Sequence, residues 1–242
     1  MKIIFRIVWF IYLAVIFLPI GIVATILTAV VTVVMSYFGD HRIWGYYPGK
    51  YWSRLMCAIS FVSVEVNGKE NIDKKQSYVF AANHQSLYDI FLIYGWIGVS
   101  FKWIMKKELR KLPFVGKACV AAGHIFIDRE NPQKAIKSIE QATKTLSEGV
   151  SVAIFPEGSR TKTGKVWKFK RGAFEIAKEV GLPIVPVTIS GGYHVMPVSR
   201  FYPIPGKLIL EIHPSVEFNP TTHEEELAMI ENIRQTVING LN

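Results

Sequence analysis

The chain has 242 residues, half of them hydrophobic, and its mean hydropathy of +0.25 is high for a soluble enzyme. Its formal net charge of +9 calls for an anionic partner, which is nucleic acid, a membrane surface or an acidic substrate. The sequence has no zinc-finger spacing, basic heptad helix or Arg-Gly repeat, so nucleic acid is disfavoured and an anionic lipid surface is favoured. Two isolated cysteines, Cys57 and Cys119, exclude a disulfide framework and a metal knuckle and are typical of a reducing compartment.

The first 40 residues are the most hydrophobic part of the chain, and residues 7–39 include no charged side chain. A signal peptide has an apolar region of only about 7 to 15 residues, so this run is too long to be one. A single straight helix over the run would measure roughly 46 Å, against a hydrocarbon core of about 30 Å. Such a helix would fit a bilayer only with a steep tilt.

Pro19 and Gly21 lie in the middle of this run, where a helix is easily kinked or broken. We therefore expect a break there and two short helices that form a hairpin, with the single tilted span as the alternative. Positive residues prefer the cytoplasmic side of a membrane, and they flank the run at both ends: Lys2, Arg6, Arg42, Lys50 and Arg54. Residues 1–54 are thus expected to anchor the chain at the cell (inner) membrane, with the rest of the chain on the cytoplasmic side.

Residues 55–242 are expected to form the second part of the chain, in which strand-like and helix-like segments alternate. Apolar or alternating runs predict strands at residues 61–66, 77–82, 150–155, 184–189 and 208–212. Helix signals predict helices at residues 131–149 and 173–180 and near the C-terminal end of the sequence, within residues 220–242. This alternation predicts an α/β layered domain with a mostly parallel sheet flanked by helices.

Two polar clusters directly follow predicted strands, and in parallel sheets active sites collect beyond the carboxyl ends of the strands. In the first cluster, Asp89 stands five residues after His84, so it can orient the imidazole and support its cationic form. By spacing alone, a histidine in a turn and an aspartate at a helix start would explain the pair better. In the second cluster, Gly158 allows the backbone to adopt conformations that other residues avoid, and Arg160 can bind a phosphate with two hydrogen bonds. A nucleotide-binding P-loop is excluded there, because five residues instead of four separate its glycines.

Four short blocks follow one another along the chain. They are Asn-His-x-x-x-x-Asp (an HX4D motif) at 83–89, Gly-x-x-Phe-Ile-Asp-Arg at 123–129, Phe-Pro-Glu-Gly-x-Arg at 155–160 and Val-Pro-Val at 185–187. In this order they resemble the glycerolipid acyltransferase family, and most closely its 1-acylglycerol-3-phosphate acyltransferases. The resemblance spans about residues 60–215, with Thr161 as a minor departure where serine is common.

The resemblance implies direct transfer of a fatty acyl chain to the free sn-2 hydroxyl of lysophosphatidic acid, which gives phosphatidic acid for phospholipid biosynthesis. His84 would act as general base on that hydroxyl, and Asp89 would orient His84. The substrate-binding positions that the family motifs imply are Lys106, Arg129, Glu157, Gly158, Arg160 and Lys170. The acyl donor would be a thioester, either acyl-CoA or acyl carrier protein, and neither a cofactor nor a metal is expected.

Three other functions compete with this one. The same chemistry can act on glycerol 3-phosphate or another lysolipid. A lipid hydrolase would use Ser86 with His84, although no Gly-x-Ser-x-Gly elbow occurs. A non-catalytic membrane-surface module would use the basic stretch 102–117, which is expected to face lipid headgroups or solvent. The expected partners are lysophosphatidic acid, the thioester donor and membrane lipids, and not nucleic acid.

Overall fold

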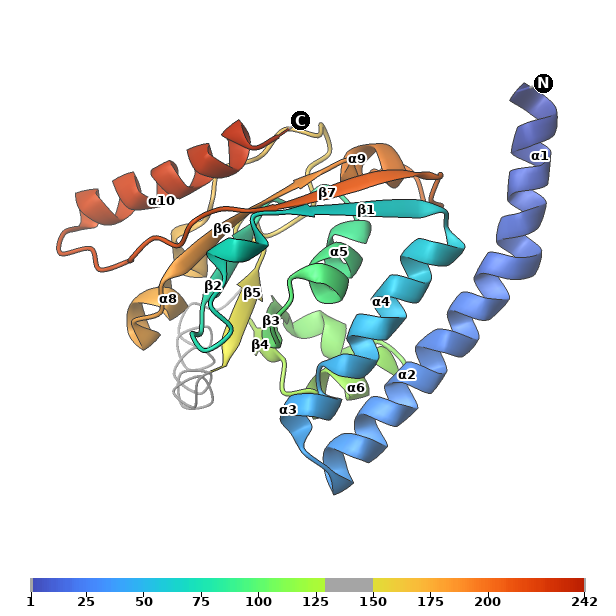
Figure 1. Cartoon of the computed structure of the whole chain (residues 1–242), viewed down its shortest axis with the longest axis horizontal. Coiled ribbons are helices and arrows are strands. Elements are labelled where there is room, and N and C mark those ends of the chain that lie inside the picture. Colours follow the sequence, from blue (N-terminus) through green and yellow to red (C-terminus); the bar gives the residue numbers. More distant parts are fainter. Residues whose placement is uncertain (1, 129–149, 242) are drawn as a thin grey trace.

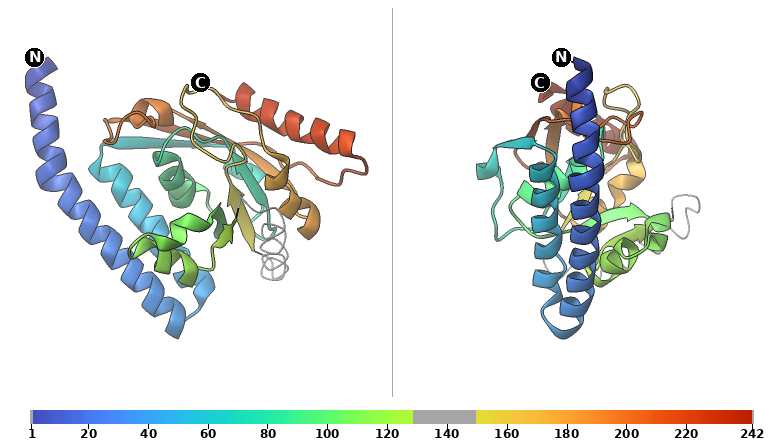
Figure 2. Two further views of the ribbon diagram at one scale, coloured as in Figure 1. Left: turned by 180° about the vertical axis from the view of Figure 1, so that it is seen from behind. Right: turned by 90° about the vertical axis from the view of Figure 1, so that its right-hand side faces the viewer.

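The computed structural model describes residues 2–128 and 150–241 (Figure 1, Figure 2). At its centre lies a seven-stranded sheet with the strand order β1-β7-β6-β2-β5-β3-β4. The strands are β1 (Val62–Asn67), β2 (Val79–Ala82), β3 (Phe101–Lys106), β4 (Ile125–Ile127), β5 (Ser151–Ile154), β6 (Ile184–Ser190) and β7 (Gly206–Ile212). The helix that we predicted at residues 131–149 lies outside the described residues.

Neighbouring strands in the sheet are parallel except for β6 and β7, which are antiparallel. The predicted α/β fold with a mostly parallel sheet is therefore confirmed. Strands β6, β2, β5, β3 and β4 all run in the same direction, so their carboxyl ends lie along one edge of the sheet. Both polar clusters follow strands that end at this edge.

Helices cover both faces of the sheet, which explains why its central strands are continuous apolar runs. Successive side chains of a strand point to opposite faces. Along β2, Phe80 and Ala82 belong to a core cluster with residues of α4 and α5, whereas Val79 and Ala81 pack with residues of α8 and α10. These helices and their neighbours are α4 (Tyr47–Ile59), α5 (Tyr88–Trp96), α6 (Val115–Ala121), α8 (Glu175–Val180), α9 (Gly192–Val195) and α10 (His223–Asn239), with short 3-10 turns at Lys69–Asn71, Lys107–Lys111 and Arg171–Ala173.

The N-terminal segment is one continuous helix, so the prediction of a break at Pro19 and Gly21 is wrong. It consists of α1 (Lys2–Tyr12), a π-helical stretch (Leu13–Phe17) and α2 (Leu18–Phe38). The backbone N–H of Leu18 donates to Leu13 O, five residues earlier. This wider turn makes room for the Pro19 ring, which would clash with the preceding turn of a regular α-helix. Gly21 instead allows α2 to pack closely on Met56 of α4.

A helical hairpin is nevertheless present, with its turn farther along the chain than expected. After α2 the chain reverses through α3 (His41–Trp44), and α4 returns beside α2 (Figure 1). The division of the chain at residue 54 stays a prediction, and this position falls inside α4.

One face of the long helix packs along the rest of the chain. Trp9 Nε1 donates to Pro203 O at 3.0 Å, and Tyr12 Oη donates to Ile59 O at 2.8 Å. Farther along, Trp52 Nε1 donates to Thr25 Oγ1 at 3.0 Å. The opposite face exposes apolar side chains over the whole length of the helix. Among the described residues this is the one helix long and apolar enough to cross a membrane, with 36 residues from Ile3 to Phe38.

Candidate active site

The fold brings the two polar clusters together at the carboxyl ends of β2 and β5. These strands are adjacent and parallel, so the chain leaves both at the same edge. The backbone N–H of His84 donates to Glu157 Oε1 at 2.6 Å. In return, the N–H of Thr161 donates to the carbonyl of His84 at 2.8 Å. The residues around His84 and those around Glu157 therefore form one site.

His84 and Asp89 form a hydrogen-bonded pair. His84 Nδ1 lies 2.9 Å from Asp89 Oδ2. Because an ionised carboxylate only accepts hydrogen bonds, the proton sits on Nδ1, and Nε2 carries the free lone pair. The Asp89 side chain is fully buried, whereas 13% of the His84 side chain is exposed. This arrangement suits a general base that substrate can reach and a buried carboxylate that supports it.

The Asp89 carboxylate is held in place by the backbone that precedes α5. Its Oδ2 also accepts the N–H groups of Gln85 at 2.5 Å and Ser86 at 2.7 Å. Its Oδ1 is buried without a hydrogen-bond partner among the described residues. Gly192 lies directly against Oδ1, and a Cβ atom at Gly192 would collide with it. Gly192 was not among the predicted site residues, although a glycine pair just beyond a buried strand often marks a close approach of the backbone.

An aromatic ring also packs against the face of the His84 imidazole. The Phe155 ring stacks on it with centroids 3.8 Å apart and an interplanar angle of 8°, and Trp103 stacks behind Phe155 at 5.3 Å. Next to His84, the Asn83 side chain exchanges two hydrogen bonds with the backbone of Ile189 in β6, at 2.9 and 2.7 Å. The imidazole is therefore held by both its backbone and its neighbours, as catalysis at a defined position requires.

Glu157 binds backbone with both of its carboxylate oxygens. Oε1 accepts the N–H of His84, and Oε2 accepts the N–H of Trp167 at 2.8 Å. Only 2% of the residue is exposed. Burial raises the pKa of this carboxyl to about 7, and the charge of Asp89 acts in the same direction, against the two N–H groups and Arg234, which lower it. Glu157 thus connects two segments of the site.

Four other predicted binding residues fall in the part of the chain that the structure describes. Gly158 has a φ of +80°, which favours glycine. The Lys170 ammonium lies close to it, since a Cβ atom at Gly158 would be 2.9 Å from Lys170 Nζ. Arg160 is partly exposed on the same loop, and Lys106 is exposed at the carboxyl end of β3, beside β5. Arg129 lies outside the described residues.

The Ser86 hydroxyl and the Cys119 thiol are unsuited to act as the nucleophile of a hydrolase. The Ser86 side chain is fully buried, and its Oγ donates to Met196 O at 2.8 Å and accepts the N–H of Tyr88. Burial raises the pKa of the Cys119 thiol to about 11, so it is not a thiolate at neutral pH. Ser86 would need a rearrangement before it could attack an ester.

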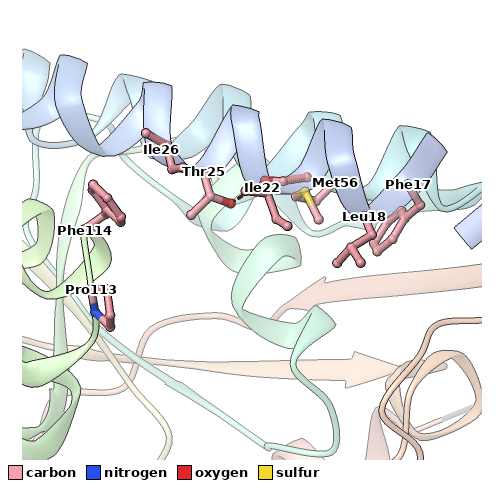
Figure 3. A pocket seen from close by; sticks show the side chains of 9 residues that line it. Phe17, Leu18, Ile22, Thr25, Ile26, Met56, Pro113 and Phe114 are labelled. Atoms are coloured by element: carbon pink, nitrogen blue, oxygen red, sulfur yellow. Dashed lines mark hydrogen bonds between the residues drawn. The ribbon is translucent and has the colours of Figure 1, made fainter. Parts of the chain in front are cut away.

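An apolar cavity of about 330 Å³ lies between α2, α4 and the segment that precedes α6 (Figure 3). Phe114 stands at its edge and has a φ of +57°, which is strained for a residue with a side chain. Gly21 leaves one wall of the cavity without a side chain. The lining residues are Phe17, Leu18, Gly21, Ile22, Thr25, Ile26, Met56, Pro113 and Phe114.

The chain is similar to known acyltransferases in sequence and in structure. A family model described as Acyltransferase matches residues 63–190. Over 73% of its length the chain is 31% identical to the 1-acyl-sn-glycerol-3-phosphate acyltransferase LPAT1 of Arabidopsis thaliana chloroplasts, and over 67% it is 33% identical to a 1-acyl-sn-glycerol-3-phosphate acyltransferase of Pseudomonas aeruginosa. It spans 51% and 62% of the lengths of these two relatives. The crystal structure of the 1-acyl-sn-glycerophosphate (LPA) acyltransferase PlsC from Thermotoga maritima is also similar, with a TM-score of 0.81, 31% identity, and coverage of 99% of this chain and 96% of that one.

Proposed function

The chain belongs to the acyltransferase family, and from this premise we propose that it transfers an acyl chain from a thioester to the sn-2 hydroxyl of lysophosphatidic acid. The product would be phosphatidic acid, an intermediate of phospholipid biosynthesis. The observation that carries the proposal is the pair of His84 and Asp89 at the carboxyl edge of the sheet, with Nε2 of His84 free to accept a proton. The acceptor is the one for which the similar acyltransferases are named, 1-acyl-sn-glycerol 3-phosphate.

In the proposed mechanism, His84 Nε2 takes the proton of the sn-2 hydroxyl as its oxygen attacks the thioester carbonyl. Asp89 stabilises the imidazolium that forms. When the tetrahedral intermediate collapses, the C–S bond breaks, and the proton on Nε2 neutralises the thiolate that leaves. No acyl-enzyme is formed, which agrees with the buried state of Ser86 and the raised pKa of the Cys119 thiol.

The phosphate of the acceptor would be bound by basic residues at the same edge of the sheet. Arg160 and Lys170 lie on the two arms of the loop that begins at Glu157, and Lys106 ends the neighbouring strand β3. Arg129 directly follows Asp128, which comes just after β4 at this edge. Arginine binds phosphate with two parallel hydrogen bonds, so we assign Arg129 and Arg160 the main role. Glu157 would position these groups and His84, because its own oxygens are engaged with backbone.

The long N-terminal helix would hold the enzyme in one leaflet of the cell (inner) membrane, on its cytoplasmic side. A helix that packs on the catalytic part from Trp9 to Thr25 cannot also cross the bilayer alone, because polar parts of the chain would have to follow it. Its exposed apolar face would lie among the lipid tails. The acceptor is a lipid, whereas the donor, acyl-CoA or acyl carrier protein, would arrive from the cytosol.

The apolar cavity below α2 would receive an acyl chain. Its lining is almost entirely apolar and includes the lipid-side helix α2, so a chain could enter it without crossing water. Chain-length preference would then depend on how much of the cavity side chains fill.

An assay of the full chain in phospholipid nanodiscs tests the proposed function. Lysophosphatidic acid is offered with acyl-CoA or with acyl carrier protein, and products are identified by mass. We expect phosphatidic acid with at least one donor, and no activity in His84→Ala that retains the wild-type unfolding transition. Preferential acylation of glycerol 3-phosphate would change the acceptor assignment, and release of fatty acid without an acceptor would identify a hydrolase.

A further inference from the structure

Helix α10, near the C-terminal end of the chain, is tied to the loop that carries the active site. Figure 1 shows α10 lying over the sheet, and its apolar side chains Ile230, Ile233 and Val237 are buried there. Two charged side chains of α10 reach residues 166–171. Arg234 donates from Nε to Trp167 O at 2.9 Å and from Nη2 to Val166 O at 3.3 Å. Glu226, which is 2% exposed, accepts Arg171 Nε at 2.8 Å.

The contacts of Arg234 lead directly to His84. The carbonyl of Val166 and the N–H of Trp167 belong to one peptide group and point in opposite directions. Arg234 donates to the Val166 carbonyl of this peptide. The Trp167 N–H of the same peptide donates to Glu157 Oε2 at 2.8 Å. The other oxygen of Glu157 accepts the backbone N–H of His84 at 2.6 Å. Donation to a carbonyl strengthens the N–H of the same peptide as a donor, so these hydrogen bonds reinforce one another.

We propose that Arg234 is a positioning residue, which holds the Val166–Trp167 peptide so that Glu157 keeps the backbone of His84 in its catalytic position. The proposal rests on the role of His84 as general base in the proposed function. Glu157 is buried and spans two segments that are 73 and 10 residues away from it in sequence, so its orientation depends on both hydrogen bonds. The Arg171–Glu226 pair ties the far end of the same segment to α10.

A purely structural role of Arg234 is the competing explanation, and the rate of the folded enzyme separates the two. In Arg234→Gln we expect kcat per folded molecule to fall by about tenfold or more, because small displacements of a catalytic group are costly. KM for the lysolipid should change by less than about twofold, since Arg234 contacts none of the proposed phosphate-binding residues. Arg234→Lys keeps the positive charge but cannot donate to both carbonyls as the guanidinium does. Its kcat should therefore lie between those of Arg234→Gln and the wild type.

Glu231→Gln is the matched control. It removes the ion pair between Glu231 and Arg234, whose Nη1 and Oε1 atoms are 2.7 Å apart, but leaves both carbonyl contacts of Arg234 in place. We expect its kcat to equal that of the wild type. A loss of kcat in Glu231→Gln equal to that in Arg234→Gln would overturn the proposal in favour of a general effect of α10.

The pH profile gives a second readout. Two charges act on Glu157. Asp89 on α5 raises the pKa of Glu157, and Arg234 on α10 lowers it. The titratable groups of His84 and Lys170 also lie nearby. Loss of Arg234 removes a stabilising positive charge, so the pKa of Glu157 should rise above its value of about 7. The acid limb of the activity profile should then move to higher pH in Arg234→Gln and stay unchanged in Glu231→Gln.

Unchanged kcat and an unchanged acid limb in folded Arg234→Gln would refute the positioning role. If Arg234→Gln does not fold, wild-type kcat in Arg234→Lys refutes it instead. His84→Ala is assayed in parallel: activity in that variant would refute the proposed function, whereas its inactivity together with wild-type kinetics of the Arg234 variants would refute this inference alone.

Discussion

Replacement of Asp89 by asparagine isolates the charge of the buried carboxylate. Oδ2 accepts three donors, which are His84 Nδ1–H and the N–H groups of Gln85 and Ser86. The amide oxygen of the new side chain would therefore occupy this place and keep His84 oriented. A charge-assisted hydrogen bond contributes about 1.5 to 3 kcal/mol, and that support for the imidazolium would largely be lost. At about 1.4 kcal/mol per factor of ten, kcat should fall by about 10- to 150-fold.

The same substitution should also lower stability. The amide nitrogen would take the place of Oδ1, which is buried against Gly192 and has no hydrogen-bond partner among the described residues. A buried donor without an acceptor costs about 1 to 3 kcal/mol, so the free energy of unfolding should decrease by that amount. Steady-state kinetics and chemical unfolding measure the two effects. Ser86→Ala keeps the backbone donor to Asp89 and is the control, with near-normal kcat expected. A kcat of Asp89→Asn within twofold of the wild type would refute the reasoning.

Three further substitutions test the phosphate site, the cavity and the anchor. Arg160→Ala should lower kcat/KM for lysophosphatidic acid by at least about tenfold through the loss of charge-assisted hydrogen bonds; an equal loss with monoacylglycerol, which has no phosphate, would contradict this role. Ile22→Phe fills part of the cavity and should shift donor preference toward shorter acyl chains in competition assays, whereas Val23→Leu on the exposed face of α2 should not. Ile3→Cys, with Cys57 and Cys119 replaced by alanine, should resist an impermeant thiol reagent added outside intact cells; labelling would exclude the anchor in the cytoplasmic leaflet.

The sequence predicted the central part of the fold well because its strands carry strong local signals. Strands β2, β5 and β6 are buried on both faces, so they read as uninterrupted apolar runs. Strand β3 was missed because it contains two lysines and was assigned to a basic surface. In the structure Lys102 is only 4% exposed, and its Nζ donates to Ala122 O at 2.6 Å. That partner is 20 residues away, and no local pattern indicates it.

Local motifs indicated the pairing of His84 with Asp89, but not the other contacts of the candidate site. The spacing of His84 and Asp89 is local, since both lie around the start of one helix, so sequence motifs are enough to pair them. The partners of Glu157 are backbone N–H groups on two other segments. Every residue except proline has such a group, so the sequence does not indicate which ones bind Glu157. The same holds for Arg234, whose acceptors are carbonyls 67 and 68 residues away. No function was therefore predicted for α10.

The π-helical stretch determines which side of α1 meets the rest of the protein. Buried positions along the long helix recur at intervals of about four residues, as in Trp9, Leu13 and Gly21, whereas a regular α-helix repeats every 3.6 residues. The wide turn at Leu13–Phe17 takes up part of this difference. If these residues formed regular α-helical turns instead, α1 would be rotated by about 100°, and Trp9 and its neighbours would point away from the body. The extra residue of the wide turn is therefore what keeps Trp9 on the side of α1 that meets Pro203.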